Sequence, residues 1–189
     1  MTTTISGTDG ITWPDGTGPS DGADVENIQG DEYAFVSRAT VASTLSQVFT
    51  GLTTAGDYKF ILRSITHETD NGSIYLRVSI DGGSTYEAGA SDYLEDGSST
   101  AQQIIFNQIG STAGEGADAE IVLPDVTNAT VFQRILAAYG GRTNATPGAY
   151  NANPHGVYVA GTDAVNAVQF ISPSGDWSGV IEAWVRAAQ

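Results

Sequence analysis

The sequence predicts an all-β protein, an antiparallel β-sandwich of the jelly-roll or Greek-key type with an extended arm at its N-terminus. Three observations favour this fold class. From about residue 33 onward, short runs of alternating apolar and polar residues are separated by Gly, Asp, Asn, Ser and Pro. No apolar period of 3.6 residues persists over several turns. Charged residues make up only 15% of the 189-residue chain, against about 25% in a typical soluble domain.

Residues 1–30 are predicted to form an extended, turn-rich arm. They contain few apolar side chains and three Asp-Gly pairs, which begin at Asp9, Asp15 and Asp21. Each pair favours a turn, because glycine accepts positive φ and aspartate bonds the backbone just ahead of it. Such an arm has too little to bury on its own, so a neighbour must hold it or it stays mobile. Trp13 is the obvious anchor, and we expect it to dock on another subunit.

Residues 31–189 are predicted to form the sandwich domain. In residues 73–80, Ile74, Leu76 and Val78 alternate with polar or aromatic residues, which is typical of a strand with one buried face. The candidate strands cover residues 32–37, 44–52, 57–65, 73–80, 102–109, 119–124, 130–139, 155–161, 165–172 and 178–187. Ten short strands after an arm favour two packed antiparallel sheets over a four-stranded propeller repeat.

The last candidate strand carries a tryptophan on its outer face. Alternation places Trp184 opposite Ile181 and on the same face as Glu182. We expect a large aromatic there to be covered by another subunit, with a sugar-stacking platform as the alternative. Trp177 and Trp184 are therefore candidate interface or glycan contacts, as is Trp13.

One turn motif stands out in residues 79–86. The spacing S-x-D-x-G-x-T-aromatic, the Asp-box best known from sialidase propellers, is met by Ser79, Asp81, Gly83, Thr85 and Tyr86. Gly82 and Gly83 allow the backbone angles of a tight turn, and the Asp81 carboxylate can accept bonds from unpaired N–H groups. There is no second Asp-box. The motif therefore predicts a structural hairpin, with the aromatic covering the turn and the strand restarting at Thr85.

Composition excludes several function classes. Seven basic and 22 acidic residues give a formal charge of −15, which would repel the phosphates of a nucleic acid. The N-terminus lacks the features of a signal peptide, and no apolar run approaches the ~20 residues of a membrane span. There is no cysteine, so disulfides and cysteine-based zinc sites are absent. We expect a chain made in a cytoplasm, without nucleic-acid or membrane partners.

No catalytic pattern was found, and we expect a protein that is not an enzyme and needs no cofactor. His67 and His155 are interpreted as plain loop residues, and neither a G-x-S-x-G elbow nor an H-E-x-x-H helix occurs. Calcium is the metal that the loops would suit best, although their spacing is not that of an EF-hand and we expect no metal site. The oxygen ligands would come from Glu68, Asp70, Asn71, Asp92, Glu95 and Asp96.

Two segments resemble structural proteins of tailed-bacteriophage virions, of the head-fibre, capsid-decoration and tail-fibre type. The run "IYLRVSIDGGSTYEAGASDY" has their strand ending in L-R-x-S, then a DGGST turn, then G-A-S-D-Y. The run "VNAVQFISPSGDWSGVIEAWV" is similar to their terminal part, although Trp184 stands where a tyrosine followed by glycine is expected. The segment "AEIVLPDV" also fits, and the similarity covers residues 57–185.

This resemblance implies a context and no active site. It implies a non-enzymatic virion protein, assembled in the host cytoplasm and exposed on the particle as a capsid decoration or fibre head. It also implies a homotrimer whose N-terminal arm attaches to other virion proteins of the capsid, neck or tail. The alternative is a host-recognition module that binds a surface glycan through the sandwich loops or a face bearing Trp177.

Overall fold

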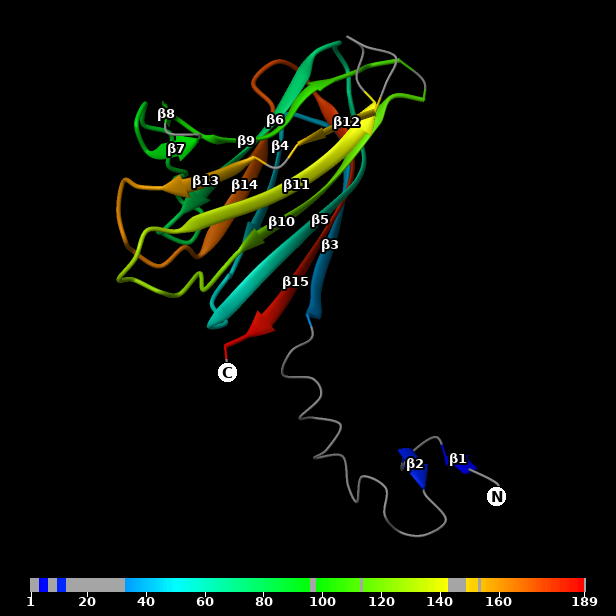
Figure 1. Cartoon of the computed structure of the whole chain (residues 1–189), viewed down its shortest axis with the longest axis vertical. Helices are drawn as coiled ribbons and strands as arrows, with labels where there is room; N and C mark the ends of the chain where they lie inside the picture. The colour runs from blue at the N-terminus through cyan, green and yellow to red at the C-terminus, as the bar shows by residue number, and fades with distance from the viewer. Residues whose placement is uncertain are drawn as a thin grey trace.

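The chain folds into two antiparallel β-sheets packed as a sandwich, which confirms the predicted fold class (Figure 1). This computed structural model describes residues 4–6, 10–12, 33–95, 98–112, 114–142, 149–152 and 154–188. These ranges contain no helix, and so none long and apolar enough to cross a membrane.

The larger sheet is built around the last strand of the chain, β15, which lies between β3 and β5. In spatial order the sheet contains β3 (Ala34–Thr44), β15 (Trp177–Ala187), β5 (Gly56–His67), β10 (Gly116–Leu123), β11 (Arg134–Arg142), β13 (His155–Tyr158), β7 (Tyr93–Glu95) and β8 (Ser98–Thr100), and β12 (Ala149–Ala152) pairs with β11. The insertion of β15 joins the two ends of the sandwich domain, since its neighbour β3 is the first strand of that domain.

The smaller sheet has four strands, and the chain enters it repeatedly from the larger one. In spatial order it contains β4 (Ser46–Thr50), β14 (Ala167–Ile171), β6 (Gly72–Ser79) and β9 (Gln103–Ile109). Each of these strands follows and precedes a strand of the larger sheet in the sequence. Successive segments therefore lie on opposite sides of a common core, as in Greek-key and jelly-roll sandwiches.

Aromatic side chains fill the space between the sheets. Phe49 of β4 and Phe170 of β14 meet Phe60 of β5 edge-on, with ring centroids 5.4 and 5.5 Å apart. Phe106 of β9 meets Tyr139 of β11 in the same way at 5.3 Å. Such pairs contribute roughly 0.5–1.5 kcal/mol each beyond the area that they bury. The inward residues of β5 and β6 alternate with outward ones, as the sequence pattern predicts.

The strand boundaries differ from the prediction near the start of the domain. The predicted strands 32–37 and 44–52 are replaced by one long strand, β3, and by β4, with a break at Leu45. Ser43, just before the break, has a φ of +48°. Residues 38–43, between the two predicted strands, show only a weak apolar alternation because their inward-facing side chains are small. The short strands β7, β8 and β12 were not predicted, since three or four residues carry too little periodicity.

Part of the predicted arm forms a small β-ladder. Strand β1 (Thr4–Ser6) pairs antiparallel with β2 (Gly10–Thr12). Trp13 and the rest of residues 1–30 lie outside the described residues, so the docking expected at Trp13 stays a prediction. The sandwich domain is described from Tyr33. The ring of Tyr33 lies 4.2 Å from the Lys59 ammonium and 5.2 Å from the Arg186 guanidinium, two cation–π contacts at the base of the arm.

Candidate functional site

The Asp-box carboxylate is bound entirely within its own loop. Asp81 Oδ1 accepts the backbone N–H of Thr85 at 2.9 Å and the hydroxyl of Ser79 at 2.7 Å. Asp81 Oδ2 accepts the Thr85 hydroxyl at 2.7 Å. The bonds from Thr85, followed by the one from Ser79, lower the pKa of Asp81 to about 2. Because each bond favours the charged form, the residue is a loop clamp and a poor proton donor.

The rest of the motif closes the same turn. Gly82 and Gly83 have φ values of +78° and +89°, in the left-handed region that favours glycine. The Gly83 N–H donates to the Ser79 hydroxyl oxygen at 2.9 Å. A side chain on Gly83 would come within 3.0 Å of the Tyr86 hydroxyl, which places the aromatic residue over the turn. These contacts agree with the predicted structural role of the motif.

Asn166 connects this loop to the start of β14. Its side-chain oxygen accepts the Gly82 N–H at 2.7 Å, and its amide group donates to the Ile80 carbonyl at 2.8 Å. Its backbone N–H donates to the Ser79 carbonyl at 2.9 Å. Sequence reasoning missed this residue, because a single asparagine 84 positions away from Gly82 gives no local signal.

The prediction that the motif closes a β-hairpin is wrong. Strand β6 ends at Ser79 and pairs with β14 and β9, whereas the chain after the motif next forms β7 in the larger sheet. Thr85 and Tyr86 do not restart a strand. A single backbone bond, from the Glu87 N–H to the Val78 carbonyl at 2.9 Å, takes the place of a return strand. The Asp-box therefore ends β6 and starts the crossing between sheets.

A buried tyrosine completes the end of β6. The phenol oxygen of Tyr93 accepts the Val78 N–H at 2.8 Å and donates to the Glu87 carbonyl at 3.2 Å. Tyr93 is fully buried, and its ring lies 5.6 Å from that of Tyr158. Burial raises the pKa of both phenols, that of Tyr158 to about 12. Both stay protonated at neutral pH, and Tyr93 acts as a hydrogen-bonded plug where the β-ladder stops.

The two histidines lie in strands, which corrects their interpretation as loop residues. His67 ends β5 and is buried, whereas His155 begins β13 and is exposed. His67 Nε2 lies 2.8 Å from the Ser172 hydroxyl, and the Thr69 N–H donates to His67 Nδ1 at 3.0 Å. Nδ1 also lies 3.0 Å from both the carbonyl oxygen and the hydroxyl of Thr69, so both ring nitrogens have hydrogen-bond partners within the fold and the tautomer sets which of them donates. The imidazole therefore joins the end of β5 to Ser172, which is itself buried.

The tryptophans occupy two different environments. Trp177 is 0% exposed, and its indole N–H donates to the Leu45 carbonyl at 3.1 Å. The interpretation of Trp177 as an interface or glycan contact is therefore wrong: no ring face is left for a partner. Trp184 lies on the outer face of the larger sheet, as predicted, where its ring meets that of Phe35 edge-on at 5.3 Å. Its indole N–H has no hydrogen-bond partner among the described residues.

The acidic loops proposed for calcium use their carboxylates in capping. Asp70 Oδ1 accepts both the N–H and the hydroxyl of Ser111, at 3.0 and 2.7 Å, and these bonds lower the pKa of Asp70. The carboxylate of Asp92 accepts the Gly89 N–H. Within the described part of the chain, no three carboxylate or histidine side chains are grouped in a way that would hold a metal ion. Asp96 lies outside that part.

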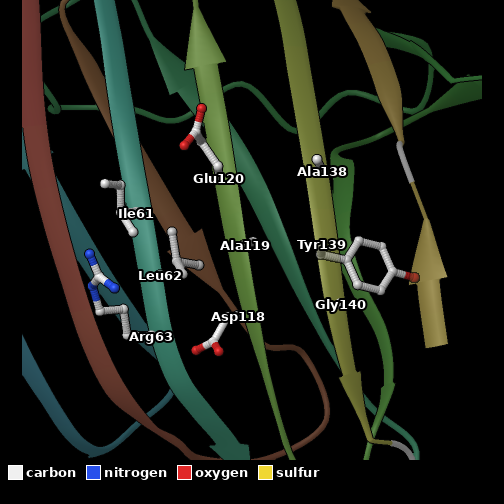
Figure 2. Close-up of a pocket in the computed structure, with 9 residues that line it drawn as sticks. All are labelled: Ile61, Leu62, Arg63, Asp118, Ala119, Glu120, Ala138, Tyr139 and Gly140. Carbon is white, nitrogen blue, oxygen red and sulfur yellow. The ribbon is translucent and has the colours of Figure 1, made fainter. Parts of the chain in front are cut away.

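The larger sheet has a shallow depression of about 410 Å³ on its outer side, over β5, β10 and β11 (Figure 2). Ile61 and Arg63 stand on β5, and Asp118 and Glu120 on the neighbouring β10. From β11 the lining contains the small residues Ala138 and Gly140 together with Tyr139, whose ring packs on Phe106 of the smaller sheet. The depression is lined by charged side chains of both signs and by apolar atoms, and a flat surface of this kind suits contact with another protein better than the enclosure of a small molecule.

No protein-family model matches the chain, and no curated protein is similar to it in sequence. The polar side chains described above form hydrogen bonds that hold loops and strand ends in place. Asp81, Asn166, Tyr93 and His67 each bond backbone groups or a buried hydroxyl, and none of these four is oriented toward the depression on the larger sheet.

Proposed function

We propose that this chain is a structural protein of a tailed-phage virion, exposed on the particle exterior as a capsid decoration or fibre head. It is attached through its N-terminal arm and assembled as a homotrimer. It has no enzymatic role. The protein takes its place on the particle as one of several virion proteins, assembled in the host cytoplasm.

The observation that carries the proposal is the use of the Asp-box. In this chain the motif is bound by its own loop through Thr85 and Ser79, and it ends a strand of a sandwich. This supports the resemblance of residues 57–185 to virion proteins in which the same L-R-x-S and DGGST segments are turns and core positions. The charge of −15 suits an exterior surface, because it keeps the protein soluble and repels DNA.

A particle-binding assay tests the proposal. The full chain is incubated with virions that lack it, and co-sedimentation is compared with that of a chain without residues 1–30. We expect the full chain to sediment with the particles and the shortened chain to stay in solution. The shortened chain must keep the far-ultraviolet spectrum of a β-protein. Equal sedimentation of both chains, or none of either, would contradict the proposal.

The host-recognition alternative keeps one of its two routes. The route through a face bearing Trp177 is lost, because that side chain is in the core, while binding of a glycan through the sandwich loops stays a prediction. A sugar ring stacks on an exposed aromatic face, which Trp177 does not offer.

A further inference from the structure

The outer face of the larger sheet holds most of the positive charge of this acidic chain. The charge-balanced face, as we define it, consists of the outward residues of β3, β15, β5, β10 and β11. Its basic side chains are Arg38, Lys59, Arg63, Arg134 and Arg186, five of the seven in the chain. Its acidic side chains are Asp57, Asp118, Glu120 and Glu182, four of the 22.

This distribution leaves the loops of the sandwich negative. The nine charged side chains just named sum to +1, whereas most of the other acidic residues that the structure describes lie in loops, among them Asp70, Asp125 and Asp163. Two copies that approached through these loops would bring like charges together, which costs several kcal/mol when they are in close contact. The strands of the smaller sheet contain no acidic residue and a single basic one, Arg77, so among the described strands the charge-balanced face is the sheet face on which charges of both signs are available for pairing.

Two adjacent strands of this face carry columns of opposite charge. Lys59 and Arg63 make a basic column on β5, and Asp118 and Glu120 make an acidic column on β10; Asp57, also on β5, forms an ion pair with Arg186 of β15. The ion pairs that the basic column forms within one chain are long: Lys59 lies 3.9 Å from Glu120, and Arg63 lies 3.6 Å from Glu182. A neighbouring copy can therefore set its acidic column against the basic column of the first.

Apolar side chains occupy the same face between the charges. Phe35 is 55% exposed and Leu136 is 41% exposed. Ile61 and Ala138 line the depression over β5, β10 and β11, and Trp184 lies beside Phe35. Exposed apolar groups ringed by charges are typical of protein–protein interfaces, in which aromatic residues and arginine are enriched.

We propose that the charge-balanced face binds a second copy of this chain, with the β5 column of one copy against the β10 column of the next. The inference deepens the oligomer part of the proposed function by naming the surface that forms it. It does not depend on attachment to a particle. The arm is not the occupant that we favour, although it is acidic, with Asp9, Asp15 and Asp21 among its first thirty residues and no basic one.

Charge-swap complementation tests this interface. One variant combines Lys59→Glu with Arg63→Glu, so that both columns are acidic. A second combines Glu120→Lys with Ala138→Lys, so that the β10–β11 side becomes basic while the Asp118 carboxylate keeps its bond to the Ser64 N–H. The matched control is Arg77→Glu on β6 of the smaller sheet. Light scattering after size-exclusion chromatography gives the mass of each variant, alone and mixed, at micromolar concentrations.

We expect the unchanged chain and the Arg77→Glu control to be oligomers. Each double variant alone should associate about 100-fold more weakly and elute as a monomer, and mixing the two should restore the oligomer. Thermal unfolding followed by circular dichroism shows whether each variant is folded. A monomeric unchanged chain, oligomers that both double variants leave intact, or a mixture that stays monomeric would overturn the inference. A chain without residues 1–30 that is monomeric would also overturn it, since the arm would then make the contact.

Discussion

The Tyr93 phenol joins the end of β6 to the loop that follows the Asp-box, so Tyr93→Phe isolates one hydrogen-bonded group. The ring, which is fully buried, is kept, and so is its contact with Tyr158. What is lost is the acceptor of the Val78 N–H, now 2.8 Å away, in a residue that is itself buried. A buried N–H without a partner costs about 1–3 kcal/mol. We expect the free energy of unfolding to fall by that amount.

Chemical denaturation with a linear extrapolation measures this change, and the melting temperature should fall by about 2–4 °C for each kcal/mol. The matched control is Tyr158→Phe. Tyr158 is also buried and its ring packs against that of Tyr93 at a tilt, but its hydroxyl does not hold the end of β6. We expect that change to stay within about 0.5 kcal/mol. Equal losses in the two variants would refute the role given to the Tyr93 hydroxyl.

Three further predictions follow from the same structure. The bonds to the Asp81 carboxylate lower its pKa to about 2, so their contribution to stability is fully present above pH 4 and is lost as the pH falls through about 2. The NMR shift of the Thr85 amide should therefore titrate with a midpoint near pH 2, and a midpoint at the ordinary aspartate pKa would contradict this. Trp177→Ala should destabilise the fold by about 3–5 kcal/mol in chemical denaturation, which a surface residue would not do. Both Gly51 and Gly56 have a positive φ, so replacing either by alanine should cost about 1–2 kcal/mol of folding free energy. A new carbon at Gly51 meets open space, whereas at Gly56 it would lie 2.0 Å from a backbone oxygen, so overpacking should cost Gly56→Ala about 1–3 kcal/mol more. Equal melting temperatures of the two variants would argue against the close contact at Gly56.

The sandwich itself could be predicted because its strands carry the signal locally. Every second residue is buried over residues 56–62 of β5 and 72–78 of β6, and a period of two is visible in the residue types alone. The order of strands in the sheets could not be predicted. The insertion of β15 between β3 and β5 depends on contacts between residues more than a hundred positions apart, for which a single sequence has no marker.

The Asp-box shows both the reach and the limit of motif reasoning. Its residue types determine the turn, so the bonding of loop N–H groups by the Asp81 carboxylate was predicted from the sequence, whereas the part played by Thr85 was not, because that residue was expected to restart the strand. Its place in the fold was not, since the motif specifies a turn and leaves the partner of the next strand open. The roles of Tyr93 and Asn166 depend on distant backbone groups. Trp177 was misjudged because one aromatic residue at the start of a strand fits either face.

Electron microscopy of purified virions tests the central claim most directly. The chain is produced with a small tag in infected cells, and the particles are labelled with gold against the tag. We expect gold at regular positions on the outside of the capsid, neck or tail, and none after treatment with an antibody of unrelated specificity. Purified particles that carry no label, while the tagged protein remains in the infected cells, would contradict the assignment of this sandwich to the virion exterior.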